Sequence, residues 1–186
     1  MSSDPEFDRK APAQSGILMN VAQDIRRIIA NNPGPFTFTG TCTYVVGHGA
    51  VTVIDPGPED EAHIDAILAG LPHERVAAIL ITHTHRDHSP GARLLAARTG
   101  APIVGCAPHR ASREALEGET KRLDASADMA HAPNRILTDG EIFEAGDHAF
   151  RVLETPGHTA NHLAFELQGS NMVFSGDHVM AWSTSI

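Results

Sequence analysis

The sequence predicts an α/β fold, in which buried strands alternate with amphipathic helices. Residues 76–81 are apolar at every position, which predicts an interior strand covered on both faces. Residues 59–71 have helical spacing, with three apolar side chains on one face. Two largely apolar runs, 42–46 and 50–54, flank a Gly-His-Gly turn. That pattern is typical of a tight β-hairpin.

The segments before this hairpin are less regular. Residues 1–16 are polar and contain Pro and Ser, so we expect a disordered tail ahead of one domain over 17–186. Residues 17–30 carry a mixed apolar pattern that fits a helix or a strand. His48, at the tip of the hairpin, is expected to be exposed.

The elements after the strand at 76–81 follow the same alternation. A helix is expected at 92–98 and a second buried strand at 102–105. Residues 107–134 form the most polar stretch. We expect a surface helix plus loop there, near the mouth of the site, with His109 and His131 exposed to solvent.

Composition narrows the classes of protein to consider. The 186 residues are one domain's worth of chain. The net charge is −9, with 14 Lys and Arg against 23 Asp and Glu. This counts against a general nucleic-acid binder, which carries a basic face, without excluding one. Cys42 and Cys106 are too few for a disulfide framework, and we expect both to be small buried residues.

The same sequence predicts a cytoplasmic protein. No apolar stretch approaches the roughly 20 residues that a helix needs to span a bilayer. The N-terminus lacks both the apolar core of a signal peptide and the Arg-rich character of a transit peptide. We therefore expect no membrane partner.

A dense cluster of potential metal ligands follows the strand at 76–81. Three imidazoles and one carboxylate fall within positions 83–88, a donor set that suits Zn²⁺, Mn²⁺ or Fe²⁺. His83 and His85 are two residues apart, so both can point at one ion. Asp87 and His88 come as the chain turns and could reach a second ion. The alternative is a solvated loop that happens to be rich in histidine.

Two later segments deliver donors in the same way. His158 ends a turn after the strand-like run 149–153, and Asp177 follows the apolar run 172–174. Open α/β sheets place their ligand sites at such strand ends. Alone, His158 would more often be structural and Asp177 would cap a turn. Together with the first cluster, both are expected to be ligands.

These segments resemble the metallo-β-lactamase-fold hydrolases in residue types, order and approximate spacing. The motifs are His83-Thr84-His85-Arg86-Asp87-His88, Thr155-Pro156-Gly157-His158-Thr159, Ser175-Gly176-Asp177 and Val53-Ile54-Asp55-Pro56-Gly57-Pro58. Residues 32–44 narrow the likeness to a branch that includes single-strand endoribonucleases and usually carries a C-terminal winged-helix domain. The resemblance covers about residues 28–186.

The resemblance implies a four-layer αβ/βα sandwich, present here mainly as its N-terminal half, and two metal ions. Zinc is expected, with manganese or iron as alternatives. The implied first-ion ligands are His83, His85 and His158; the second-ion ligands are Asp87 and His88; Asp177 bridges the two. Asp55 is either an outer-shell residue that orients a ligating imidazole or a turn-capping aspartate. Thr159 is a weaker outer-shell candidate.

The chain departs from the family pattern after Asp177. The family supplies another histidine to the second ion well downstream, whereas here the only later histidine is His178. We expect His178 at the rim of the site, facing substrate. The domain is expected to be incomplete at its C-terminus. A sandwich cut after its first sheet would expose an apolar face, so we expect a homo-oligomer or association through the missing half.

By this resemblance the protein is a metal-dependent hydrolase of a phosphodiester or a related ester. A hydroxide bridged between the ions would attack, and Asp87 is the catalytic candidate that orients it or moves its proton. The substrate would be a small molecule or single-stranded RNA. Among hydrolases, a thioesterase resembling glyoxalase II is the alternative. β-Lactam hydrolysis fits less well, because its best-known enzymes place cysteine at the bridging position or omit that ligand.

Two alternatives come from other classes. Relatives carry out oxygen chemistry with equivalents of His83, His158 and Asp177, so a mononuclear iron dioxygenase is one. Such an enzyme would hold iron and consume O₂. The other is a metal-binding fragment without activity.

Overall fold

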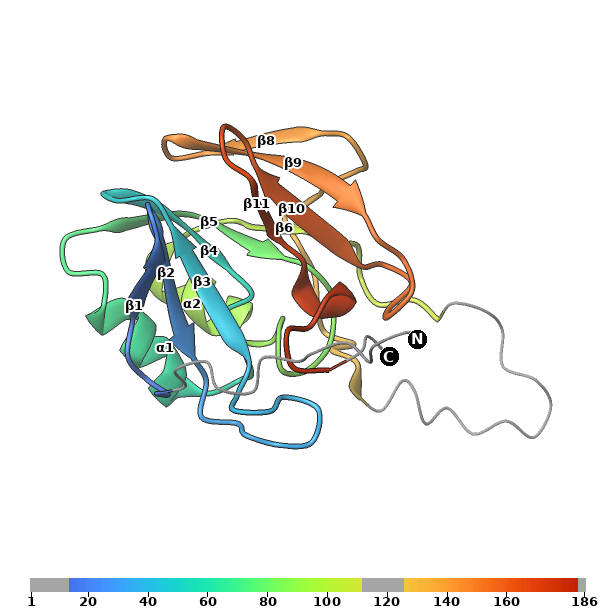
Figure 1. The fold of residues 1–186 in the computed structure, drawn as a ribbon, viewed down its shortest axis with the longest axis horizontal. Coiled ribbons are helices and arrows are strands. Elements are labelled where there is room, and N and C mark those ends of the chain that lie inside the picture. Colours follow the sequence, from blue (N-terminus) through green and yellow to red (C-terminus); the bar gives the residue numbers. More distant parts are fainter. Residues whose placement is uncertain (1–13, 112–125, 184–186) are drawn as a thin grey trace, which may run out of the picture.

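The computed structural model describes residues 14–111 and 126–183, which form two packed β-sheets with helices on one side (Figure 1). The first sheet has seven strands in the order β1-β2-β3-β4-β5-β6-β7. They are β1 (Met19–Ala22), β2 (Ile25–Ile29), β3 (Cys42–Val46), β4 (Ala50–Ile54), β5 (Arg75–Ile81), β6 (Ile103–Gly105) and β7 (Arg135–Ile136). Pairing is antiparallel from β1 to β4 and parallel from β4 to β7.

The second sheet has four antiparallel strands in the order β11-β10-β9-β8. They are β8 (Ile142–Ala145), β9 (His148–Glu154), β10 (Leu163–Leu167) and β11 (Met172–Phe174), and a 3₁₀ turn, η2 (Gly176–His178), follows. Because this sheet covers the inner face of the first, the expected bare apolar face on the first sheet is wrong. Ile142 and Val173, on the other face of the second sheet, are 47% and 51% exposed.

Two helices, α1 (Glu61–Ala69) and α2 (Gly91–Thr99), complete the described fold. Asp60 caps α1, since its carboxylate accepts a hydrogen bond from the backbone N–H of Ala62. Gly100 ends α2 in the left-handed conformation that glycine adopts without strain. Within the described ranges the fold thus has three layers, helix–sheet–sheet, of the predicted four. None of the described helices is long and apolar enough to cross a membrane.

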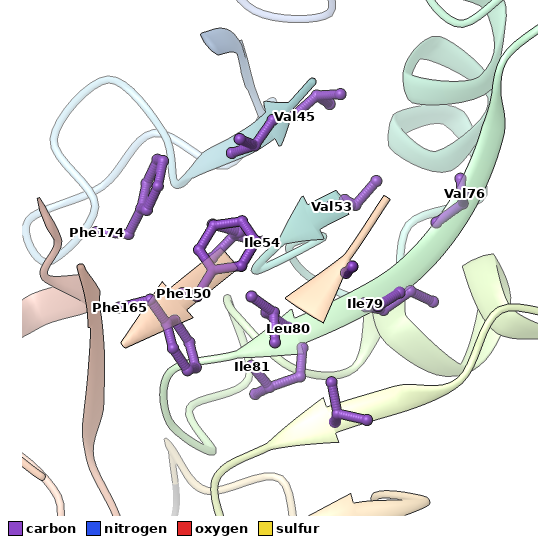
Figure 2. Packing of buried hydrophobic residues seen from close by; sticks show 14 of the residues in the cluster. Val45, Val53, Ile54, Val76, Ile79, Leu80, Ile81, Phe150, Phe165 and Phe174 are labelled. Atoms are coloured by element: carbon purple, nitrogen blue, oxygen red, sulfur yellow. The ribbon is translucent and has the colours of Figure 1, made fainter. Parts of the chain in front are cut away.

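The main core lies between the two sheets. Phe150 and Phe165 come from the second sheet and pack against the side chains around Ile54 and Leu80 of the first (Figure 2). All four side chains are at most 1% exposed, and burial of each contributes about 1.5–3 kcal/mol. β5, buried between β4 and β6, is the interior strand that its apolar sequence predicts.

Several local predictions can be compared directly with the structure. The ambiguous segment 17–30 forms β1 and β2, and the hairpin of β3 and β4 leaves His48 exposed, as predicted. Cys106 is buried, whereas Cys42 is only half-buried. The expected tail at 1–16 lies outside the described residues except for its end, where Gly16 donates a backbone hydrogen bond to Ile29. Part of the expected surface helix, 112–125, also lies outside them.

Candidate metal centre

All six predicted ligands lie at one edge of the sandwich, where strands of both sheets end. His83 to His88 follow β5, His158 lies between β9 and β10, and Asp177 sits in η2 after β11. Asp55 follows β4, which is parallel to β5, so the ends of these two strands meet at this edge. The backbone N–H groups of His88 and Ser89 both donate to the carbonyl of His85. Because of this tight turn, the side chains of His83 and His85 point in one direction and those of Asp87 and His88 point in another.

The first cluster consists of His83, His85, His158 and Asp177. One donor atom from each lies within 4.8 Å of the others. His85 Nδ1 is 3.2 Å from His83 Nε2 and 2.9 Å from His158 Nε2. Three imidazole nitrogens therefore converge on one point, together with a carboxylate oxygen.

The second cluster consists of Asp87, His88 and Asp177. His88 Nε2 is 3.3 Å from Asp87 Oδ2 and 3.3 Å from Asp177 Oδ1. The other oxygen of Asp177, Oδ2, is 3.5 Å from His158 Nε2. The Asp177 carboxylate thus presents one oxygen to each cluster, the position expected of a residue shared by two ions.

Burial and mutual repulsion keep the His83 and His85 imidazoles of the first cluster neutral. Burial, reinforced by the neighbouring His158, lowers the pKa of His85 to about 4. The pKa of His83 lies well below its ordinary value for the same reason, burial first and then the surrounding histidines. A neutral imidazole has a lone pair to donate, which is the form that a metal ion requires.

The second cluster favours positive charge. Burial opposes ionisation of His88, yet the carboxylates of Asp87, Asp177 and Asp55 raise its pKa well above the ordinary value. Although burial alone would raise them, the pKa values of Asp87 and Asp177 are lowered by His88. These carboxylates therefore stabilise a cation at the position where His88 stands between them.

Asp55 holds both the end of β5 and one imidazole. It is 3% exposed, with a left-handed backbone at φ 48°. Its carboxylate accepts hydrogen bonds from the Thr82 backbone N–H at 2.8 Å and the Thr82 hydroxyl at 2.6 Å. The same carboxylate is 3.0 Å from His88 Nδ1, so it orients the ring whose Nε2 faces the second cluster. These contacts support the outer-shell interpretation of Asp55.

His162 is a member of this site that the sequence analysis missed. It is 1% exposed, and its ring stacks on that of His83 with centroids 4.9 Å apart at 28°. Its Nδ1 is 2.8 Å from the Thr155 hydroxyl, and burial lowers its pKa to about 4. His162 therefore packs against the ring of His83, one of the predicted ligands. No local pattern marked His162, because the segment between His158 and His162 is not helical and a spacing of four residues does not place side chains on one face there.

Gly176 leaves room for these groups. A Cβ at this position would lie 2.7 Å from both His162 Nε2 and the Thr82 hydroxyl, and the backbone has φ 50°. Only glycine avoids both the collision and the strained conformation. The Gly-Asp sequence therefore has a steric basis, since it allows the next residue, Asp177, to approach the clusters closely.

The remaining predicted residues are His178, which lies at the rim, and Thr159, which is buried in the turn that presents His158. His178 is exposed, and its ring centroid is 6.0 Å from that of His162, in keeping with the expected rim position. Thr159 is 6% exposed, and its hydroxyl has no hydrogen-bond partner among the residues that the structure describes. Its carbonyl accepts hydrogen bonds from Gly157 and His162, so Thr159 shapes the turn that presents His158.

Residues 126–131, here called the brace segment, form backbone contacts with residues 83–88, here called the ligand loop. Ala127 pairs with His85 in an antiparallel bridge, and the backbone N–H of Asp128 donates to the carbonyl of Thr84 at 2.7 Å. The prediction that His131 is exposed was wrong, because it is 5% exposed and its Nε2 lies 3.2 Å from the Cys106 carbonyl. His109 is half-buried, with Nδ1 3.1 Å from the Thr84 hydroxyl.

Asp128 fastens this brace to α2. Its carboxylate is 5% exposed and accepts hydrogen bonds from the Ser89 hydroxyl and the Arg93 guanidinium, each at 2.8 Å. Asp128→Ala should lower the free energy of unfolding by about 1–3 kcal/mol, because the buried Ser89 hydroxyl loses its acceptor and Arg93, whose side chain is 35% exposed, loses its ion pair. Zinc affinity should fall about tenfold as the ligand loop loosens. Urea unfolding and a zinc titration with a chelating dye measure both effects.

The matched control is Asp65→Ala. Asp65 also pairs with an arginine, Arg98, but its side chain is 63% exposed. An exposed pair contributes about 0–1 kcal/mol, and this one is not part of the brace. Equal effects of the two substitutions on zinc affinity would contradict the role assigned to Asp128.

The donor set fits a divalent metal. Three imidazole nitrogens and a carboxylate oxygen converge in the first cluster, and its carboxylate also serves a second cluster that stabilises positive charge. Imidazole and carboxylate together are typical ligands of zinc and of other borderline transition metals. The fold and site therefore define a two-sheet sandwich with two adjacent candidate metal sites at its edge.

Comparison with known proteins gives the family. Residues 36–184 match the family described as the metallo-beta-lactamase superfamily. The chain belongs to this superfamily, and the predicted sandwich fold is confirmed.

Two similar proteins illustrate the range of relatives. "Atrochrysone carboxyl ACP thioesterase" of Aspergillus chevalieri is 30% identical over 169 residues, which are 88% of this chain and 48% of that protein. "Lactamase-like protein nscB" of Trichophyton rubrum is 30% identical over 172 residues, 91% of this chain and 48% of that protein. The chain thus spans about half the length of the curated relatives it matches.

The structural comparison agrees on the fold. A beta-lactamase domain protein from Burkholderia ambifaria superposes with a TM-score of 0.72 at 20% identity, covering 97% of this chain and 63% of that one. The endoribonuclease branch named from the sequence stays a prediction.

Proposed function

We propose that the protein is a zinc-dependent hydrolase of thioesters. The observation that carries the proposal is the pair of donor clusters sharing the Asp177 carboxylate. His83, His85, His158 and Asp177 would hold one ion, and Asp87, His88 and Asp177 the other. When bound, such ions supply Lewis-acid polarisation of the scissile carbonyl and activation of water at neutral pH.

The thioester is preferred over the phosphodiester of the sequence analysis for two reasons. A relative 30% identical to this chain is named as an acyl carrier protein thioesterase. The chain also has a net charge of −9, which repels a polyanion such as RNA. Hydrolysis adds water across the C–S bond and gives a carboxylate, a thiol and a proton.

The chain's own residues would position the reactants. Asp87 is held by the Thr41 hydroxyl, which donates to Oδ2 at 2.7 Å, while the Asn32 side chain holds Thr41. Because the pKa of Asp87 is lowered by His88 despite burial, its carboxylate stays ionised near neutral pH. An ionised carboxylate accepts a hydrogen bond from the attacking water, which is the role we assign to Asp87.

A substrate panel tests this proposal. The purified chain is analysed for metal content and then assayed with an acyl thioester of N-acetylcysteamine, a bis-aryl phosphodiester and single-stranded RNA. We expect bound zinc and release of free thiol. A chelator should abolish turnover and added zinc restore it. RNA cleavage without thioester turnover would contradict the proposal, as would metal binding without any turnover. Bound iron with O₂ consumption would favour the dioxygenase alternative instead.

A further inference from the structure

A cavity of about 260 Å³ opens beside the second cluster and is lined in part by His88 and Asp177. Its walls come from β2, β3, the loop that precedes β3, and residues 173–182. The cavity is therefore continuous with the candidate metal centre, yet most of its lining plays no part in holding an ion.

The cavity gathers aromatic side chains. The chain has a single Trp and a single Tyr, and both line the cavity, together with Phe38 and Phe174. The Phe38 and Trp182 rings stack with centroids 5.5 Å apart at 17°. The Tyr44 and Phe174 rings are tilted, with centroids 5.3 Å apart. We call this space the aromatic cavity and define it by Phe38, Tyr44, Phe174 and Trp182.

The aromatic and aliphatic part of the lining suits a flat, apolar group. The charged lining residues are Arg27 on β2 and, at the candidate metal centre, Asp55, His88 and Asp177. Burial raises the pKa of Tyr44 to about 12, so its hydroxyl stays neutral. Ile29, Ile54 and Val179 add apolar surface to the lining. A volume of about 260 Å³ is just below the roughly 300–1,000 Å³ of pockets that hold a drug-sized ligand. A group of one or two rings is the size that such a cavity admits.

We propose that the aromatic cavity binds the acyl part of the substrate and selects an aromatic acyl group of one or two rings over a short alkyl group. The inference rests on the proposed thioester hydrolysis. With the ring in the cavity, the acyl carbonyl lies toward His88 and Asp177, and the thiol arm extends toward solvent. Ring-to-ring contacts favour an aromatic occupant beyond the apolar area that it buries.

Trp182 allows binding to be measured without turnover, because the only tryptophan of the chain lies in the cavity wall. Zinc-loaded protein is titrated with 2-naphthoate, which mimics the product, and with acetate, while tryptophan fluorescence is recorded. We expect a saturable change with 2-naphthoate and none with acetate. Phe38→Ala should weaken 2-naphthoate binding about tenfold.

Two further variants keep the result interpretable. Phe36→Ala is the matched control, because Phe36 is 73% exposed in the same loop and does not line the cavity. Its 2-naphthoate affinity should equal that of the unmodified chain. Phe38→Leu keeps apolar volume while removing the ring, so it carries the test if Phe38→Ala fails to fold by circular dichroism.

Kinetics separate this inference from the proposed function. Phe38→Ala should raise KM for a naphthoyl thioester about tenfold, whereas Phe36→Ala should leave the turnover of naphthoyl and acetyl thioesters unchanged. The cavity inference is overturned by a non-saturable fluorescence response, or by equal weakening in the Phe36 and Phe38 variants, even if thioesters are hydrolysed. Saturable 2-naphthoate binding without turnover of any thioester would instead overturn the proposed function and leave the cavity assignment standing.

Discussion

His85→Ala is expected to remove the first-cluster ion and thioester turnover together. His85 Nδ1 faces both His83 Nε2 and His158 Nε2, so its loss removes the nitrogen at the centre of the first cluster. Zinc content should fall by about one ion per chain, and the rate should drop by about three orders of magnitude or more, toward background. Elemental analysis after gel filtration and a thiol-release assay measure the two effects on one sample.

His48→Ala is the control for this substitution. His48 lies at the exposed tip of the hairpin, with 63% of its side chain accessible, far from the ligand loop in the sequence. Its replacement removes one imidazole from the chain and should leave zinc content and rate unchanged. Full zinc content in His85→Ala would reject His85 as a ligand.

Asp55→Ala is expected to have the largest effect on stability. The substitution leaves the Thr82 N–H and hydroxyl without their acceptor and removes the carboxylate that faces His88. Breaking a buried charged pair by removing one partner costs about 3–5 kcal/mol. Because Asp55 also orients His88, affinity for the second ion should fall about 10- to 100-fold. Urea unfolding of metal-free protein isolates the first effect, and zinc titration measures the second.

Asp55→Asn keeps the shape of the side chain at position 55 and removes its negative charge. Asparagine tolerates the left-handed backbone at φ 48°, and its amide oxygen can still accept from the Thr82 N–H. Most of the stability should return, while second-ion affinity stays low because the carboxylate beside His88 is gone. Zinc affinity in Asp55→Asn equal to that of the unmodified chain would contradict the orienting role.

The sequence predicted those parts of the fold and of the site in which apolar residues or candidate metal ligands lie close together along the chain. The interior strand at 76–81 and the ligand-rich residues 83–88 are local patterns, and their placement follows from strand geometry alone. The structure brings His158 and Asp177 to the same edge as these residues. That they bind metal there stays a prediction for the experiments above.

Long-range contacts explain what the sequence did not reveal. Asp128 meets Ser89 across 39 positions, and His131, predicted exposed, is buried against Cys106. Polar residues in a polar stretch give no sign of such packing, because the partner determines their burial. The pattern at 17–30 fitted helix and strand alike, and pairing with β3 decides in favour of strand.

The distance along the chain between the donors has a consequence for assembly. The first cluster joins residues as far apart as His83 and Asp177, so it exists only once the two sheets have docked. An ion that needs all of these donors binds the native state and not the unfolded chain, and mass action then shifts the folding equilibrium. Zinc should therefore raise the melting temperature in proportion to the logarithm of its concentration. The ion would bind late in folding and link the two sheets of the sandwich.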